Sequence, residues 1–473
     1  GSTVDNAGML QLDPAVAGAV ALAGDYRHGS TASLGLQVGD RLEVSGQAQL
    51  YGGALHITGK RDFVSAGQQH TVLHAVAGLS GTFSQITQPS TLFVDAQLSY
   101  SANAVDLLLN RLDVLTVAAT LGTPTPASLA SAQRIEHAFT AIDDDLRQPT
   151  TTLADGFVRA AASLQGITTQ SQARASLHSL SGAVHGKAMA ASLDSFGHDR
   201  GQLAARLASG QGHGAWRQRL HGAPLAPGWQ GSGWQQGQGI ALGPQLQAGM
   251  SFGQSELTPQ QADDGRSQDR QTQGQLWLAA QRGQGYLLGM AGSGRIQRQL
   301  ERNLQLGDLH QLAQTRYNGW MHSAAVEAGW RLPALAGVAL QPYLGLAWEQ
   351  ARSDGFTEVD AYGFGLKADV LDLRRQLGQA GVRLAWEQAG WQLDGELRWQ
   401  QVLGHNGAAW QARFTGTDAW APLDIQALLR SHGQLRLGVS RALGQHGQLR
   451  VGLDKTLGRI GDDQARLQWV QGF

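Results

Sequence analysis

The segment Gly249–Gly253 reads Gly-Met-Ser-Phe-Gly, which matches the G-x-S-x-G pattern of many serine hydrolases. In those enzymes the serine is a nucleophile held on a sharp turn between a strand and a helix. Here Ser251 lies inside a segment of alternating apolar and polar residues, which is typical of an uninterrupted strand. We therefore do not expect Ser251 to be catalytic.

Residues that could bind a metal lack the close spacing of a metal site. His310, His322, His405 and His432 are scattered along the chain, and there is no cysteine. The three aspartates at 143–145 close a helical pattern and are interpreted as a solvated helix end rather than a calcium site. The sequence therefore predicts no cofactor and no metal.

Charged residues of the C-terminal half instead alternate with apolar ones. Glu396 and Arg398, for example, alternate with Leu397 and Trp399. Such a period of two is typical of transmembrane β-barrel strands, in which one face meets lipid and the other a wet lumen. A soluble sandwich would also alternate, but closely spaced segments of roughly ten residues or more with Trp near their ends favour the barrel. Twelve of the 13 tryptophans follow Gly228, where this pattern runs.

Twelve such segments are predicted from His213 onward. An even number of antiparallel strands can close without an exposed edge and leaves both ends of the sheet on one side of the membrane. The bore would be intermediate between a filled eight-stranded barrel and an open porin, so it could admit one helix. The predicted strands span 213–222, 229–241, 244–257, 267–282, 283–300, 311–331, 337–355, 373–389, 390–404, 427–443, 446–458 and 463–473.

The polar face of these strands is expected to line the lumen of the barrel. Charges placed there need partners, because an unpaired charge away from bulk water is costly. The four histidines named above are expected in loops or in this lumen. The predicted lumen-facing charged residues are Glu349, Arg383, Glu387, Asp394, Glu396, Arg398, Arg436, Arg450, Asp454 and Arg466.

Composition limits the classes of function. The 473 residues include 63 glycines and 15% charged residues, with a formal net charge of −1, which argues against a nucleic-acid partner. The absence of cysteine fits a chain that crosses an oxidising compartment before it folds. No apolar run reaches the roughly 18 to 20 residues of a transmembrane helix, and the first residues do not resemble a secretion signal peptide.

A glycine-rich stretch with helical spacing, residues 171–208, directly precedes the predicted barrel. Gly182, Gly186, Gly197 and Gly201 would each cost a helix interior roughly 1 kcal/mol relative to Ala, so this helix needs tertiary support. A slim, charged helix at this place is best explained as a plug of the lumen, with a surface helix as the alternative. The predicted lumenal helix spans 181–210 and carries Lys187, Asp194, Asp199, Arg200 and Arg206.

The N-terminal 112 residues form short strand patterns punctuated by Gly and Asp. Leu42, Val44, Leu55 and Ile57, with turns at glycines between them, suit the last turns of a parallel β-helix, and a small sandwich suits the pattern equally well. Residues 113–180 then have helical character and are predicted to form a linker.

The whole layout resembles the C-terminal translocation unit of a type Va (classical monomeric) autotransporter. The resemblance covers essentially the full chain: a passenger stub with β-helix and autochaperone-like character (1–112), a helical linker (113–180), a lumenal helix (181–210) and a 12-stranded translocator barrel (211–473). The segments at 129–146, 177–196 and 214–222 are similar in particular to the region downstream of the protease in subtilisin-like serine protease autotransporters.

The resemblance implies a translocator in the Gram-negative outer membrane that secretes and anchors its own passenger at the cell surface. It implies insertion by the outer-membrane barrel-assembly machinery, contact with periplasmic chaperones and a monomeric state. Leu467, Trp469 and Phe473 would form the C-terminal assembly signal, although Gln471 interrupts their apolar face. The Asn-Asn site at which some members release the passenger has no counterpart, so autocatalytic release is not predicted.

The motifs around the catalytic residues of subtilisin are absent, so a protease passenger would precede residue 1 and this chain is not expected to be an enzyme. Two rival hypotheses remain from the sequence. One is an outer-membrane hydrolase with its active site in the barrel loops. The other is a soluble, β-rich adhesin.

Overall fold

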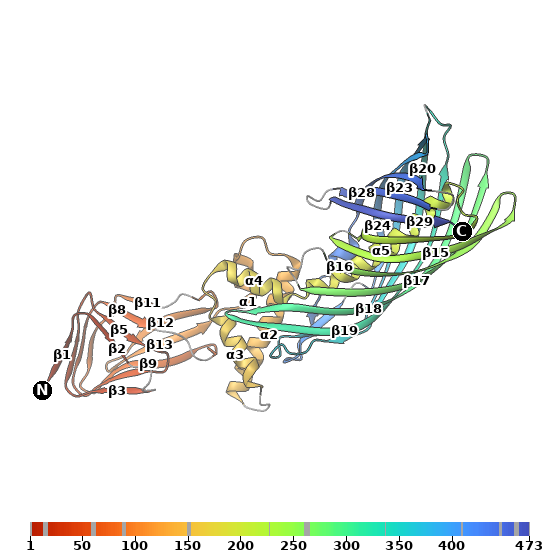
Figure 1. The fold of residues 1–473 in the computed structure, drawn as a ribbon. Coiled ribbons are helices and arrows are strands. Elements are labelled where there is room, and N and C mark those ends of the chain that lie inside the picture. The colour runs from red at the N-terminus through yellow and green to blue at the C-terminus, as the bar shows by residue number, and fades with distance from the viewer. Residues whose placement is uncertain are drawn as a thin grey trace.

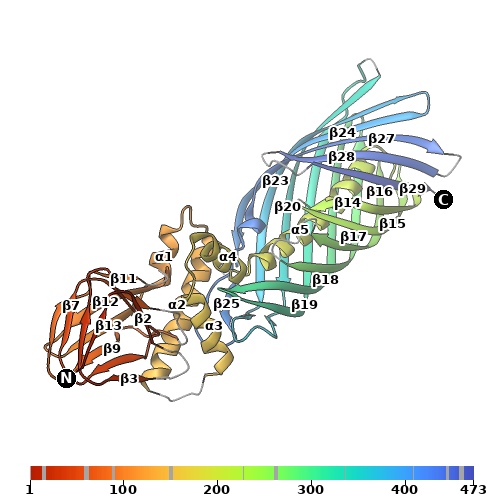
Figure 2. The ribbon, with the colours of Figure 1, turned by 60° about the vertical axis from the view of Figure 1, so that its left-hand side comes forward.

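The computed structural model describes three parts that follow one another along the chain. Figures 1 and 2 show a coil of short strands, a layer of helices, and a barrel with a helix inside it. No helix in this described structure is both long and apolar enough to span a membrane. The described residues are 2–12, 18–57, 63–87, 91–148, 153–226, 228–259, 265–335, 337–407, 410–443, 447–457 and 463–472.

The coil is built from short strands that pass from one sheet to the next along the chain. Two sheets are parallel, in the orders β1-β4-β7-β10 and β11-β8-β5-β2. In the third sheet β3, β6 and β9 are parallel, and the hairpin β12-β13 pairs antiparallel with β9. The strands are Thr3–Asn6, Met9–Gln11, Ala19–Leu22, Asp25–His28, Ser33–Leu36, Arg41–Val44, Ala48–Tyr51, Ala54–Ile57, Gln68–Ala75, Leu79–Thr82, Gln85–Thr87, Val94–Tyr100 and Ala104–Arg111, in order β1 to β13.

An apolar interior fills the space between the three sheets. Leu34, Leu36, Val44, Leu55 and Val72 are fully buried there. Such a parallel, three-sheet coil is not a sandwich of two antiparallel sheets, so the sandwich alternative for this region is wrong.

Five helices follow the coil: α1 Val114–Thr120, α2 Pro126–Arg147, α3 Asp155–Gln165, α4 Gln170–Leu180 and α5 Ala183–Ala208. Helix α2 begins with a reciprocal cap, in which the Thr125 hydroxyl accepts from the Ser128 amide and the Ser128 side chain bonds back to Thr125. The helical stretch predicted over 171–208 is broken in two. Gly182 adopts a left-handed φ of 73°, which separates α4 from α5 and suits a residue without a Cβ.

Asp143 does not lie at a solvated helix end, as the sequence had suggested. It is buried, and its carboxylate accepts a hydrogen bond of 3.0 Å from Arg111 at the end of β13, while Arg111 also donates to Glu136 at 2.6 Å. The local pattern was misleading because α2 continues to Arg147 and turns Asp143 toward the coil, whereas Asp144 is exposed and Asp145 half-buried.

Hydrogen bonds to backbone groups join the coil to the helical layer. The buried side chain of Gln165, at the end of α3, accepts from the Val64 amide and donates to the Val64 carbonyl, each at 2.9 Å. The amide of Leu92 donates to the carbonyl of Ile167 at 2.8 Å. Because these bonds satisfy buried backbone groups, the base of the coil depends on the helices.

The barrel is closed and antiparallel, which confirms the predicted twelve strands. Its first strand, β14, pairs with its last, β29, with Trp216 opposite Gly472. The strands are β14 Gly214–Ala226, β15 Trp229–Gly243, β16 Leu246–Pro259, β17 Arg266–Arg282, β18 Gly285–Leu306, β19 Leu309–Trp330, β20 Val338–Ser353, β23 Leu371–Gln388, β24 Trp391–Asn406, β27 His432–Leu443, β28 Gly447–Leu457 and β29 Asp463–Gly472.

Alternation sorts the residues of these strands between the two faces of the wall. On β20, Leu344 and Leu346 are 69% and 64% exposed on the outside, whereas Glu349 is 1% exposed in the interior. This apolar outside and charged inside are what lipid and a polar bore require of a transmembrane barrel.

One mouth of the barrel, here named the loop end, carries the two longest connections between its strands, those after β20 and β24. The other, here named the turn end, carries tight turns such as residues 283–284 and 389–390. The connections after β20 and β24 form a small sheet, which the sequence did not predict. Its strands share one apolar core with α1 to α4 and with barrel residues near the loop end. They are β21 Phe356–Thr357, β22 Leu366–Ala368, β25 Gln411–Phe414 and β26 Ala421–Pro422, followed by a short 3-10 helix at Gln426–Leu429.

The pairing of Gln165 predicts that the substitution Gln165→Leu loosens the base of the coil. The variant leaves the buried amide and carbonyl of Val64 without partners, which costs about 2 kcal/mol or more. Hydrogen exchange should show faster exchange of the amides in β9, Gln68–Ala75. The exposed Gln170, which accepts a hydrogen bond from Arg174, is the control, and Gln170→Leu should leave exchange unchanged. Equal exchange in both variants would contradict a structural role for Gln165.

Candidate functional site: the helix inside the barrel

Helix α5 runs inside the barrel from the loop end to the turn end (Figure 2). Its 26 residues correspond to about 39 Å, which exceeds the roughly 30 Å hydrocarbon core of a bilayer. At the loop end, Gly186 lies against the connection after β24, where an added Cβ would come within 2.2 Å of the Asp424 carbonyl oxygen. At the turn end, the Ala208 carbonyl accepts hydrogen bonds from Gln341, at 3.1 Å, and from Arg331.

A loop-end cluster fixes the start of the helix. His185 is fully buried, with Nδ1 3.0 Å from the Tyr317 hydroxyl and Nε2 2.9 Å from Glu358. Arg302 of β18 donates to both carboxylate oxygens of Glu358, at 2.7 and 2.6 Å. Burial alone would raise the pKa of Glu358, but Arg302 and His185 hold this pKa well below its ordinary range. The cluster therefore joins a helix, two strands and a loop through one ionised carboxylate.

A central cluster holds the middle of the helix. Arg200 donates to Glu349 of β20 at 2.8 Å, and Arg375 of β23 binds the other oxygen of the same carboxylate at 2.7 Å. Asp194 lies 3.9 Å from Arg375. The side chains of Arg200, Glu349 and Arg375 are at most 5% exposed. Removing one partner would leave a buried charge uncompensated, which is strongly destabilising.

Further contacts follow the length of the helix. The Ser192 hydroxyl donates to Asp269 at 3.1 Å, and Arg298 donates to Ser192 at 2.8 Å and to Asp269 at 2.9 Å. Asp199 accepts a hydrogen bond from Gln273, and His198 lies 2.9 Å from an Arg436 nitrogen. Arg206 lies over the ring of Trp216 at 4.8 Å from its centroid, in the geometry of a cation–π contact.

A third group, the wall cluster, consists of barrel side chains that pair with one another. Arg383 donates to Glu327 at 2.6 Å and to Glu396 at 3.2 Å, and Arg436 donates to Glu396 at 3.3 Å. The Tyr343 hydroxyl donates to Glu396 at 2.7 Å, and the Arg383 guanidinium lies 4.0 Å from the centre of the Tyr343 ring. The lumen that α5 leaves open is thus occupied by long, paired side chains.

The structure places most of the predicted site residues in the lumen. On the helix, Asp194, Asp199, Arg200 and Arg206 make the contacts above, whereas Lys187 is exposed. On the barrel, Glu349, Arg383, Glu396, Arg398 and Arg436 are buried inside, and Asp394 is half-buried in the same register. The side chains of Arg450, Asp454, Arg466, Leu467 and Trp469, and the whole of Phe473, lie outside the described residues.

Two expectations about side-chain position are wrong. Glu387 shares the inward register but lies one residue before the end of β23, so it is exposed at the rim rather than buried in the lumen. His322, expected in a loop or in the lumen, is exposed on the outer face of β19, between the inward residues Met321 and Ser323. Alternation alone could have assigned this face.

Sequence reasoning missed several of the most buried polar residues. Asp269, Arg298 and Glu327 lie in the inward register of predicted strands, so the alternation could have identified them. Glu358 lies in a connection without periodicity and is 173 residues from His185 in the chain, so no local signal could have revealed it.

The lumen does not have the geometry of a serine hydrolase around Ser251. This residue lies inside β16 with its side chain buried toward the bore, and a strand continues on both sides. Its hydroxyl has no hydrogen-bond partner among the described residues, so no base is in reach. Within the same described part of the chain, no three His, Asp or Glu side chains converge as a metal site would require.

Comparison with known proteins supports a family assignment. The family model of the autotransporter β-domain matches residues 210–454, more than half of the chain. A search of curated protein sequences finds no match. Among solved structures, the translocator domain of autotransporter NalP from Neisseria meningitidis is 16% identical, covering 60% of this chain and 98% of that one, with a TM-score of 0.45.

Two further similar structures are also autotransporter domains. The β-domain of the Bordetella autotransporter Brka is 17% identical over 55% of this chain and 98% of that one, with a TM-score of 0.37. The transport unit of AIDA-I from Escherichia coli is 12% identical over 55% and 88%, with a TM-score of 0.32. The family model is the match that carries the assignment, and from it we conclude that this chain belongs to the autotransporter β-domain family.

Proposed function

We propose that this chain is an outer-membrane translocator that secretes its own N-terminal passenger and then anchors it. One observation carries the proposal: the polypeptide itself passes through the closed barrel as α5. The coil and the helical layer lie beyond the loop end (Figure 1), whereas β14 begins and β29 ends at the turn end (Figure 2). In a membrane-inserted barrel, everything before α5 would therefore face the opposite side from the barrel's own chain ends.

The proposed roles follow this order along the chain. Residues 1–112 would be the end of a passenger β-helix with an autochaperone-like role, 113–180 a helical linker, 181–210 the lumenal helix and 211–473 the translocator barrel. The loop end would face the cell surface and the turn end the periplasm. The parallel three-sheet coil and its dependence on Gln165 support the passenger role of the N-terminal part.

The partners proposed for this function are outer-membrane lipid, the barrel-assembly machinery, periplasmic chaperones and the passenger itself. We propose a monomer, because one closed barrel already contains a helix of its own chain. The resemblance of 129–146, 177–196 and 214–222 to subtilisin-like autotransporters supports a protease passenger upstream of residue 1. The burial of Ser251 in a strand disfavours the rival hydrolase.

The direct test is secretion in a Gram-negative host. A reporter domain fused before residue 1, with a signal peptide, should become accessible to added protease on intact cells. A fusion that stays protected while the barrel is folded in the outer membrane would refute the translocator proposal. Folding can be checked separately, because folded outer-membrane barrels migrate differently on a gel before and after heating.

If α5 plugs the lumen, two truncated chains with and without this helix should differ greatly in conductance. Residues 181–473 keep α5, whereas residues 210–473 lack both the helix and everything beyond the loop end. In planar bilayers the shorter chain should conduct several-fold more current, because the bore then holds only strand side chains and water. Equal conductance of the two would show that α5 does not seal the barrel.

The close approach at Gly186 predicts that Gly186→Ala unseats the start of the helix. A Cβ would meet the Asp424 carbonyl at 2.2 Å, and this backbone atom cannot move aside as a side chain would. The variant should show frequent channel openings and a lower temperature of heat modification. Gly197→Ala is the matched control, because its Cβ would lie 3.8 Å from its nearest neighbour and should improve helix propensity by roughly 1 kcal/mol. Identical behaviour of the two variants would show that the close contact between Gly186 and Asp424 does not hold the start of the helix.

The proposed C-terminal signal predicts that Phe473→Ala slows insertion into the outer membrane. Pulse-labelled cells should accumulate unfolded barrel in the periplasm for several-fold longer than wild type. Leu457→Ala, at the end of the preceding strand, is the control for a general loss of apolar surface. Normal insertion kinetics of the Phe473 variant would refute the proposed role of Phe473 in the assembly signal.

A further inference from the structure

The outer face of the barrel is basic near the loop end. Four outward-facing arginines lie on the adjacent strands β18, β19, β20 and β23, and all four are exposed: Arg295, Arg316, Arg352 and Arg374. We name these residues the arginine belt. Strand register places Arg295 and Arg352 on either side of Trp320, which is 45% exposed. The Arg295 guanidinium lies 5.7 Å from the centre of the Trp320 ring.

Acidic side chains do not neutralise this belt. Two acidic residues lie among the four arginines: Asp372, which lies 3.8 Å from Arg374 and accepts a hydrogen bond from Gln350, and the exposed Asp354, two residues after Arg352. At the flank, Arg266 and Arg270 are opposite Glu301 and Glu256 in the strand register, so they add little net charge. The belt therefore keeps an excess of positive charge on the outer surface.

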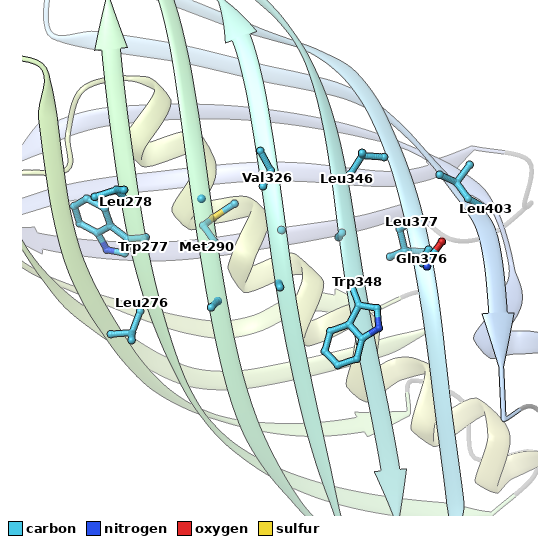
Figure 3. A pocket seen from close by; sticks show the side chains of 15 residues that line it. Leu276, Trp277, Leu278, Met290, Val326, Leu346, Trp348, Gln376, Leu377 and Leu403 are labelled. Atoms are coloured by element: carbon cyan, nitrogen blue, oxygen red, sulfur yellow. The ribbon is translucent and has the colours of Figure 1, made fainter.

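An apolar groove of about 800 Å³ lies on the same strands, further from the loop end. In Figure 3, Leu276 and Leu278 lie on one strand and Leu346 and Trp348 on another, with the strands of Met290 and Val326 between them. The outward positions of those middle strands are small residues, Gly289, Ala291 and Ala324, which leave the wall hollow there.

The groove and the belt are in register. Ala291, Ala324 and Trp348 each lie four residues along their strand from Arg295, Trp320 and Arg352. Four residues of strand correspond to about 14 Å. The row between Arg295, Trp320 and Arg352 and the groove is polar and outward-facing, and in it Arg374 of the belt lies beside Ser293, His322 and Gln350.

We propose that the arginine belt and this groove form one binding site for a phosphorylated, multiply acylated glycolipid of the outer leaflet. The guanidinium groups bind phosphate, for which their planar donors suit bidentate contacts, and Trp320 lies at the level of the headgroup, where Trp is favoured. The polar row faces the sugar, and the acyl chains lie in the groove over Gly289, Ala291 and Ala324. The proposal rests on the proposed function only for the orientation, in which the loop end faces the outer leaflet.

The test uses the full chain purified in detergent and bisphosphorylated, hexa-acylated lipid A as the probe. Native mass spectrometry and a fluorescence titration should show binding that falls at least tenfold when both phosphates are removed from the lipid. The double substitution Arg295→Gln and Arg352→Gln should cause a similar loss. Ala324→Trp, which fills the groove, should also lower affinity at least tenfold.

Arg441→Gln is the matched control. Arg441 is also exposed on a strand, and its guanidinium lies 5.0 Å from the centre of the Trp391 ring, but at the turn end. This variant should bind lipid A as the wild type does. Inorganic phosphate should not compete, because the acyl chains are part of the recognition. The gel shift on heating confirms that each variant is folded, and the single change Arg352→Gln replaces the double variant if that one fails to fold.

Equal binding of the dephosphorylated lipid, an equal loss with Arg441→Gln, or full competition by inorganic phosphate would each overturn the proposal. Lipid binding and secretion are measured separately, so the two proposals can fail independently. Normal secretion without lipid A binding would refute only the proposed lipid site. Lipid A binding without secretion would count against the proposed translocator function.

Discussion

Closure of the sheet between β14 and β29 decides how both faces of the barrel wall must be built. A closed sheet has no unpaired edge, but it turns one face of every strand into a confined bore. Charges in that bore are stable only if they are paired. Glu349 meets this requirement by binding Arg375 of the wall and Arg200 of α5 together, so the helix completes the electrostatics of the barrel as well as filling it.

The loop end extends this dependence to the remainder of the chain. Arg134 of α2 donates to the Pro422 carbonyl at 2.9 Å and to the Ser181 carbonyl at 2.7 Å. One side chain thus ties the helical layer to a barrel loop and to Ser181, two residues before the start of α5. Since Gln165 joins the same layer to the coil, the coil, helices, loops and lumenal helix form a continuous set of packed contacts. These contacts hold the base of the N-terminal coil at the mouth of the barrel.

The outside of the barrel obeys the same alternation but is not uniform along its height. Leu344 and Leu346 face outward at the middle of β20, whereas Arg352 faces outward near its loop end. The outer surface of the barrel is therefore apolar at mid-height and basic near the loop end, so its two ends differ. Outward arginines near a lipid surface are tolerated because the long side chain can extend its charge toward the headgroups.

The twelve strands could be predicted from the sequence because lipid and lumen impose opposite polarity on adjacent residues. The lumenal helix could be predicted because a glycine-rich, charged helix is stable only when other parts of the protein surround it. The hydrogen-bond and ion-pair partners of the buried charges could not be predicted. Glu358 lies in a loop without periodicity, yet it binds His185 and Arg302. Asp143 lies near the end of a helical pattern and was expected to be solvated, yet it binds Arg111. Local periodicity is enough to predict the number of strands and the face that most side chains take. Which buried charges meet depends on distances between residues far apart in the chain, so it is visible only once the chain is folded.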